Sequence, residues 1–401
     1  MLNAISTCLG CGSESVLVLL DLGAQPPSNR FVRCGEVNHE AHTLRIAQCQ
    51  VCALIQLQDP MPPAMVRTHF DWLTYNEPES HLDNLVEDLR CLPSLKPNSR
   101  IVGLSYKDDS TLDRFNRLGY VNTLRLDLSQ DLGIHDPCAG LESIQSVVVE
   151  KHMKVLAARH GTADLIIVRH VIEHAHDPGE FLCAFGPMLS PGGCLVLEIP
   201  DCSKFIAACD YSFIWEEHVT YFSPATFSRF AQTHGFAIER LLDYPYPLEN
   251  SLVAILTPST PVVSEVPDQE EMELGRRFAQ AYTHRRNKIR DDLQQLRSRG
   301  RRIAIFGAGH LAAKFLNFFD LREIIECVID DNPNKRGLSM PGSNLPILSS
   351  KALDDGGIDL CLLSLSPESE RKVLSLKQDF LTKGGRFMSI FELSPLSLKV
   401  V

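Results

Sequence analysis

Four cysteines near the start of the chain have the spacing of a metal site. Cys8 and Cys11 form one Cys-x-x-Cys pair, and Cys49 and Cys52 form another, with 37 residues between the two pairs. A turn of this kind presents two thiolates to one ion, and Zn²⁺ prefers four tetrahedral ligands. Because four protein ligands leave no position for water, we predict a structural zinc site. Incidental cysteines or a redox-active pair are the alternatives.

A histidine in the middle of the chain is a candidate general base. Glu217 and His218 are followed by Ser223 and Pro224, which together favour the start of a helix, so we expect His218 in a loop. An imidazole titrates near neutral pH, and an adjacent carboxylate can orient its ring and stabilise its cation. The pattern therefore predicts proton abstraction by His218. A histidine that simply packs in a loop is the alternative.

The region around His218, residues 100–257, alternates apolar runs with helical patterns, which predicts parallel β-α-β units. Four runs read as strands: RIVGLSY at 100–106, TLRLDL at 123–128, ADLIIVRH at 163–170 and CLVLEIP at 194–200. A cofactor of the nucleotide type binds at the carboxyl ends of the first strands of such a sheet. Six residues at these ends are therefore candidates for cofactor binding: Gly103, Ser105, Tyr106, Asp109, Asp127 and Arg169.

Two features of this edge favour different interpretations. Asp127 follows Gly103 by 24 positions, and an acidic residue there commonly holds the two hydroxyls of a ribose. The glycine-rich loop that lets a backbone approach such a ligand closely is absent, because Gly103 lies inside the strand and the next residues are Ser105, Tyr106 and Lys107. A loop with a purely structural role is the alternative.

Further along the same domain, three histidines and a glutamate crowd the end of a predicted strand. They are His170, Glu173, His174 and His176, and they precede Asp177-Pro178, which is typical of a helix start. A second metal ion is one interpretation, hydrogen-bonded turn histidines are another, and a place in the cofactor pocket is a third for His170.

The chain as a whole divides by pattern into five segments. Residues 1–60 form the zinc-binding module, and 61–99 read as a mostly helical segment that lines the active site. Residues 100–257 form the first α/β domain, 258–300 a proline-rich acidic linker with a long helix at about 270–298, and 301–401 a second α/β domain. The fold class is therefore α/β, with two doubly wound Rossmann-like domains and a small N-terminal zinc-binding module.

The second α/β domain carries a possible nucleotide loop. Gly307 and Gly309 follow a strand, and Asp330 ends the next strand 23 positions after Gly307. This arrangement is typical of dinucleotide binding. A tight turn whose glycines allow close strand-to-helix packing is the alternative.

Composition excludes several classes of function. The 401 residues contain 39 Lys and Arg against 50 Asp and Glu, a net charge of −11, which does not favour nucleic-acid binding. There is no apolar run long enough for a transmembrane helix, and the opening MLNAISTCLGCG does not resemble a secretory signal. Most of the 13 cysteines lie singly in apolar surroundings, so we expect reduced thiols and a cytoplasmic protein. The sequence indicates no oligomeric state.

The order of these parts resembles the three-domain sugar C-methyltransferases, which use S-adenosylmethionine to methylate nucleotide-linked keto-deoxysugars. The resemblance covers nearly the whole chain. It rests on the two cysteine pairs with LDLGAQP (20–26) between them, Tyr75, His170, Glu217-His218 with Tyr221-Phe222-Ser223, and Gly307-Ala308-Gly309 with DNPNK at 331–335.

This resemblance implies a mechanism and its participants. Zinc would be structural, and the middle domain would bind S-adenosylmethionine. His218, with Glu217 as its partner, would remove the proton alpha to a ketone, and the resulting enolate would take the methyl group. Tyr75 and His170 would contact the sugar or the enolate oxygen. The partner is then a small molecule, a nucleotide-linked sugar, rather than a nucleic acid or a membrane.

The chain departs from this family in the cofactor loop. Asp109 and Thr111-Leu112 match the family pattern, but Tyr106 and Ser110 stand where glycines are expected. Tyr106 would crowd the space for methionine and ribose, so the cofactor either sits differently or is not bound. A non-methylating enzyme that uses His218 or NAD at Gly307–Gly309, and a catalytically silent binding protein, are therefore the alternatives.

Overall fold

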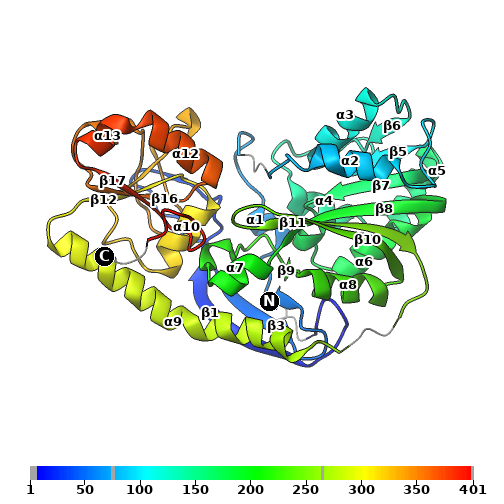
Figure 1. Cartoon of the computed structure of the whole chain (residues 1–401), viewed down its shortest axis with the longest axis horizontal. Helices are drawn as coiled ribbons and strands as arrows, with labels where there is room; N and C mark the ends of the chain where they lie inside the picture. Colours follow the sequence, from blue (N-terminus) through cyan, green and yellow to red (C-terminus); the bar gives the residue numbers. More distant parts are fainter. Residues whose placement is uncertain (1–6, 74–76, 263–265, 399–401) are drawn as a thin grey trace. The chain divides into compact units, whose positions relative to one another are not determined.

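The chain folds into two compact units in the computed structural model, which describes residues 7–73, 77–262 and 266–398. Figure 1 follows the chain from blue to red. The first unit comprises Met1–Val18, Ile46–Ser203 and Glu217–Met272, and the second comprises Leu19–Arg45, Lys204–Glu216 and Glu273–Val401. Among the described residues, no helix combines the length and apolarity needed to cross a membrane.

The first unit is built on a six-stranded sheet with the order β10-β11-β8-β7-β5-β6. Its strands are β5 (Ile101–Gly103), β6 (Thr123–Arg125), β7 (Ala163–Arg169), β8 (Leu189–Asp201), β10 (Phe236–Tyr244) and β11 (Asn250–Pro258). Strands β5 to β8 are parallel, and β11 is inserted antiparallel between β8 and β10. Each of the four predicted strands is present, which confirms the α/β class of this domain.

Helices cover both faces of this sheet (Figure 1). They are α2 (Leu82–Arg90), α3 (Asp109–Arg117), α4 (Leu141–Val147), α5 (Glu150–His160), α6 (Pro178–Ala184) and α8 (Pro224–Thr233), whereas α1 (Pro63–Val66) contacts α4. Successive strand residues point to opposite faces. Accordingly, Ile101 and Leu165 pack with α2 and α3, whereas Val102 and Ile166 pack with α5, α6 and α8. The strands are therefore buried on both sides, as in a doubly wound domain.

The segment 61–99 is less helical than its sequence suggests. Only α1 and α2 form in the part of it that the structure describes, and turns or extended chain make up the remainder. Pro62, Pro63 and Pro78 explain the difference, because proline removes a helical hydrogen bond and disfavours helix at the residue before it.

A second sheet joins the cysteine module to the His218 region. Its order is β1-β3-β4-β9, with β1 (Val16–Gln25), β3 (His42–Cys49), β4 (Ile55–Leu57) and β9 (Thr220–Tyr221). Within the first unit, Ile55 pairs with Tyr221 and Gln56 with Thr220. The strand that follows the second cysteine pair is therefore the neighbour of the strand that follows His218.

The second unit contains a five-stranded parallel sheet with the order β15-β13-β12-β16-β17. Its strands are β12 (Ile303–Phe306), β13 (Cys327–Ile329), β15 (Ile347–Leu348), β16 (Leu360–Leu363) and β17 (Arg386–Ser389). Its helices include α10 (His310–Phe318), α11 (Lys351–Asp354), α12 (Pro367–Leu376) and α13 (Gln378–Thr382). In addition, β2 (Val32–Arg33) pairs with β14 (Leu338–Ser339). This is the second Rossmann-like domain.

Two helices cross the boundary between the units. They are α7 (Ser203–Ala208) and α9 (Gln269–Ser298), which begin in the first unit and continue in the second. The long helix predicted at about 270–298 is therefore confirmed as α9.

We expect Asp108 to contribute more to stability than its neighbour Asp109. The buried Asp108 carboxylate accepts the backbone N–H groups of Ser105 (2.8 Å) and Arg169 (2.9 Å), which ties the loop after β5 to the end of β7. Asp108→Ala leaves both donors unpaired and should lower the free energy of unfolding by about 1–3 kcal/mol. Asp109→Ala, which removes a part-exposed ion pair to Arg125, should cost less than about 1 kcal/mol. Urea denaturation measures both, and equal losses would contradict this role of Asp108.

Candidate active site and metal centre

The four predicted zinc ligands come together in the first unit. Cys8 Sγ lies 3.5 Å from Cys52 Sγ, Cys11 Sγ lies 3.6 Å from Cys49 Sγ, and all four sulfurs lie within 4.8 Å of one another. A tetrahedral zinc ion with Zn–S bonds of about 2.3 Å requires sulfurs roughly 3.8 Å apart. The four thiolates therefore fit Zn²⁺ with no open coordination position, as a structural site requires.

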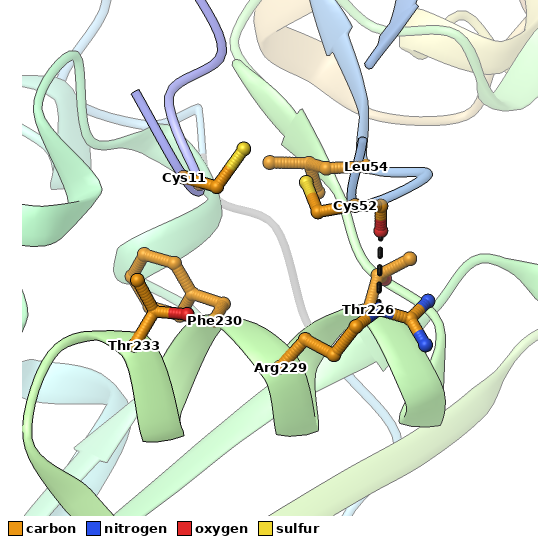
Figure 2. A pocket seen from close by; sticks show the side chains of 8 residues that line it. Cys11, Cys52, Leu54, Thr226, Arg229, Phe230 and Thr233 are labelled. Atoms are coloured by element: carbon orange, nitrogen blue, oxygen red, sulfur yellow. Dashed lines mark hydrogen bonds between the residues drawn. The ribbon is translucent and has the colours of Figure 1, made fainter. Parts of the chain in front are cut away.

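The cysteine module is anchored to helix α8. Figure 2 shows Cys11, Cys52 and Leu54 facing Thr226, Phe230 and Thr233 of this helix across a small hollow. Arg229 donates a hydrogen bond from Nε to the carbonyl oxygen of Cys52 (3.2 Å) and pairs through Nη2 with Glu271. The zinc module is thus packed against the domain that carries His218.

The carboxylate of Glu198, on β8, is the most heavily bonded group at the candidate active site. It accepts hydrogen bonds from Nε of Arg169 (2.5 Å) and from the hydroxyl of Ser251 (2.8 Å). Ring nitrogens of His81 and His170 each lie 3.1 Å from the same carboxylate. Burial opposes ionisation of Glu198, but these hydrogen bonds and positive charges hold its pKa well below its ordinary value. Glu198 therefore stays charged and links β8 to the end of β7, through Arg169, and to the start of β11, through Ser251.

His170 is held in a constrained, charged state beside Glu198. Its backbone is in the left-handed region (φ 54°), which is uncommon for a residue other than glycine. Burial disfavours the cation, but the ion pair with Glu173, the hydrogen bond to Glu198 and the charges of Glu198 and Glu77 outweigh it and raise the pKa of His170 to about 10. His170 therefore presents a cation at neutral pH and cannot serve as a base there.

His218 lies in a loop, as predicted, and the structure brings two further residues to it. The Ser223 side chain caps α8 with Thr226, which sets the end of this loop. The rings of His174 and His218 are perpendicular with centroids 4.8 Å apart, and Glu173 offers an oxygen within 4.8 Å of a nitrogen of each. His218, His174 and Glu173 therefore form one cluster.

The proximity of Glu173 and His174 to His218 cannot be read from the spacing of these residues, because it depends on a backbone contact. The N–H of Val219 donates to the carbonyl oxygen of Glu173 (2.7 Å), and the N–H of Leu57 on β4 donates to the carbonyl oxygen of Val219 (2.9 Å). The adjacent Glu-His pair after a buried strand was the available signal. Of the other predicted catalytic residues, Glu217 is nearly buried, and Tyr75 lies outside the described residues.

The predicted cofactor residues fall into two groups. Gly103, Ser105 and Arg169 are buried and build the edge of the sheet, since a Cβ on Gly103 would fall 2.8 Å from that of Asp108. Tyr106 is 40% exposed, Asp109 is part-exposed and Asp127 is exposed, so these three present side chains at the surface. The registers of β5 with β6 and β7 place their loops along one edge. This arrangement fits a nucleotide-type cofactor.

Tyr106 lies in an acidic part of this edge. Burial, followed by the negative charges of Glu142, Glu217 and Glu77, raises the pKa of its hydroxyl, so Tyr106 remains a neutral hydrogen-bond donor. Its ring also lies 5.8 Å from Nζ of Lys107, which pairs with Glu77 (3.2 Å). Tyr106 is therefore close enough to Glu142, Glu217 and Glu77 for their charges to act on its hydroxyl.

The glycine loop of the second unit is tightly packed. Gly307 has φ 101°, and a Cβ there would fall 2.7 Å from Leu365. Asp330, which would hold a ribose in a dinucleotide site, accepts the N–H of Ala308 (2.9 Å) and pairs with Lys335 (2.8 Å). These contacts favour the packing interpretation of the two glycines.

The residues just before Glu217 belong to the second unit. The Trp215 ring stacks on His310 with centroids 4.4 Å apart, and Glu216 pairs with the buried Lys314 and accepts the N–H of Ser28. The stretch that contains the candidate base is therefore anchored on its N-terminal side by packing within that unit.

We expect Cys52→Ser to release the zinc ion. Three ligands bind zinc far more weakly than four, so zinc released by titrating the thiols with a mercurial should fall from about one per chain to near zero, with a lower melting temperature. Cys91→Ser is the control, because Cys91 is exposed and outside the cluster. Unchanged zinc in Cys52→Ser would contradict the site.

The charge of His170 predicts a pH dependence of stability. Because its folded pKa of about 10 lies above the ordinary value near 6.5, its contribution is complete below about pH 6.5 and is lost as the pH rises through 10. The destabilisation caused by His170→Gln should therefore be largest near pH 6 and shrink toward pH 10 in urea denaturation. His176, whose pKa burial lowers, gives a control of opposite sign. A destabilisation that does not change with pH would refute the charged state.

Two family models match parts of this chain. Residues 264–391 match the model described as "C-methyltransferase C-terminal domain", and residues 8–66 match "Putative zinc binding domain". The protein C-methyltransferase NovU of Streptomyces niveus is 24% identical over 409 residues, which cover 97% of this chain and 96% of NovU.

Two solved methyltransferase structures also match part of this chain. The S-adenosylmethionine-dependent methyltransferases of Geobacter sulfurreducens and Thiobacillus denitrificans, both in complex with S-adenosyl-L-homocysteine, are 10% and 12% identical, each with a TM-score of 0.30. They match 45% and 49% of this chain and 91% and 96% of their own. Such likenesses are too weak to carry an assignment. The matches near both ends of the chain, together with the similarity to NovU along its length, make this chain similar to C-methyltransferases that carry an N-terminal zinc-binding domain.

Proposed function

We propose that this protein transfers a methyl group from S-adenosylmethionine to a carbon atom of an enolisable carbonyl compound, and that a nucleotide-linked keto-deoxysugar is its substrate. The observation that supports this most strongly is the position of His218, in a loop beside Glu173 and His174, in a chain that is similar to C-methyltransferases. The sugar follows from the motif resemblance. We also propose that it acts in the cytoplasm and that its five segments have the predicted boundaries.

The first unit offers groups that suit the cofactor. Asp127 is exposed at the end of β6, where its carboxylate can accept the hydroxyls of a ribose. Its Oδ1 accepts the N–H groups of Ser129 (2.9 Å) and Gln130 (2.8 Å), which orients the carboxylate. Asp109 and Tyr106 would border the remainder of the molecule. S-adenosylmethionine, when bound, supplies an electrophilic methyl group on a positively charged sulfur.

His218 would act as the general base. Removal of a proton alpha to the carbonyl breaks a C–H bond, transfers the proton to a ring nitrogen of His218 and leaves an enolate, whose carbon becomes the nucleophile. Glu217 would stabilise the imidazolium that forms. The negative oxygen of the enolate needs a positive or hydrogen-bonding partner in a pocket away from water. His170, which carries its charge at neutral pH, would supply it, together with Tyr75.

We expect His218→Asn to abolish proton abstraction without loss of cofactor binding. Loss of a general base typically costs 10²–10⁴-fold in rate, so methyl transfer from S-adenosylmethionine to a nucleotide-linked keto-deoxysugar, followed by mass spectrometry, should fall by about that factor. Calorimetric binding of S-adenosylhomocysteine should be unchanged. His176→Asn is the control, since His176 follows His174 by two residues but lies outside the cluster.

Deuterium exchange separates the base from the methyl donor. In D₂O with S-adenosylhomocysteine, the wild-type protein should exchange the substrate's alpha proton without methylating it, and His218→Asn should not. A His218→Asn protein with full exchange would contradict the base assignment. A wild-type protein that turns over substrate and shows no affinity for S-adenosylmethionine would contradict methyl transfer itself.

A further inference from the structure

We propose that Glu173, His174 and His218 form a second metal site, which binds a divalent transition ion such as Zn²⁺ or Co²⁺ and thereby blocks the candidate base. The binding of the ion stands on geometry alone. Its inhibitory effect rests on the proposed function, because a lone pair of His218 that is shared with a metal cannot take a proton from the substrate.

The three side chains converge on one point. One nitrogen from each ring and one oxygen of Glu173 all lie within 4.8 Å of one another. The centre of such a triangle is at most about 2.8 Å from each atom, and bonds from zinc to nitrogen or oxygen are about 2.1 Å long. An inward movement of less than about 1 Å per side chain would therefore complete the coordination.

The carboxylate of Glu173 is buried and has acceptor positions that no hydrogen bond uses. Its side chain is 1% exposed, and within the described part of the chain neither carboxylate oxygen has a hydrogen-bond partner. The nearest charged neighbour with a stated distance is Nδ1 of His170, 3.5 Å away. This ion pair satisfies the buried carboxylate only in part, because it makes no hydrogen bond, and coordination to a second cation would satisfy it further.

The backbone holds the ligands in place before any ion arrives. Glu173 and His174 belong to a buried 3₁₀ turn, Ile172–His174, in which the N–H of Ala175 donates to the carbonyl oxygen of Ile172 (3.0 Å). The hydrogen bond from Val219 to Glu173 joins this turn to the residue after His218. The two segments that supply the ligands are thus already fastened to each other, so little ordering is needed on binding.

The ligand set determines which ions fit and what they leave open. Two imidazoles and a carboxylate suit Zn²⁺, Co²⁺, Fe²⁺ or Mn²⁺, and three protein ligands leave positions for water or another small donor. This differs from the four-thiolate site, which is saturated. Thiol reagents should therefore release metal from the cysteine site only.

The first test counts metal ions per chain. The purified full-length protein, with zinc in its cysteine site, is dialysed against Co²⁺ and analysed by elemental mass spectrometry and visible absorption. We expect about one thiol-bound zinc and one cobalt with nitrogen and oxygen ligands per chain. Glu173→Gln and His174→Asn should each lose the cobalt and keep the zinc, and His176→Asn should keep both.

Retained thiol-bound zinc in the variants shows that they are folded, because the cysteine module packs on the same domain. A wild-type protein that binds no cobalt, or Glu173→Gln and His174→Asn proteins that bind it as the wild type does, would overturn the site. Neither result bears on methyl transfer, because neither measurement uses cofactor or substrate.

The second test addresses inhibition. The rate of alpha-proton exchange by the wild-type protein is measured as Co²⁺ occupancy rises, and it should fall in proportion to the occupied fraction and recover when a chelator removes the ion. An exchange rate that is unchanged or rises with occupancy would overturn the blocking role while leaving the site itself intact. Absence of exchange in the metal-free protein would instead count against the proposed function.

Discussion

The buried charge of Glu198 is the constraint around which the first unit is organised. A carboxylate at zero exposure is tolerated only if its partners satisfy it fully, and here Arg169, His170, His81 and Ser251 do so from three parts of the chain. Arg169 also reaches the carbonyl oxygen of Lys107, so the same charge positions the loop after β5. The left-handed backbone of His170 is kept by these contacts.

Two kinds of histidine result from this arrangement. His170 faces the carboxylates of Glu173 and Glu198 and is charged, whereas burial and the positive charges of His218, Lys107 and His170 keep the pKa of His174 well below its ordinary value. The buried end of β7 therefore holds a cation at His170 next to a neutral imidazole at His174. The charge state of each of these two histidines thus follows from the charged groups that its ring faces.

Local patterns predicted the parts of the structure that depend on neighbours in sequence. The two cysteine turns, the strands before Gly103 and Arg169, the Ser223 cap and helix α9 all follow from short-range rules and are present. The cluster of Glu173, His174 and His218 was not foreseen, because it needs the pairing of β4 with β9 and the contact of Val219 with Glu173. Prolines shortened the helices expected in 61–99, an effect that hydrophobic periodicity does not register.

The pairing of β4 with β9 also determines how this protein can be divided. Although residues 1–60 read as a separate module, β4 supplies the hydrogen-bonded neighbour of the strand that begins two residues after His218. A truncated chain that starts at residue 61 would expose the edge of β9 and free the Val219 carbonyl oxygen. The same limit applies in evolution, because the zinc-binding part cannot be lost or exchanged without altering the loop that carries His218.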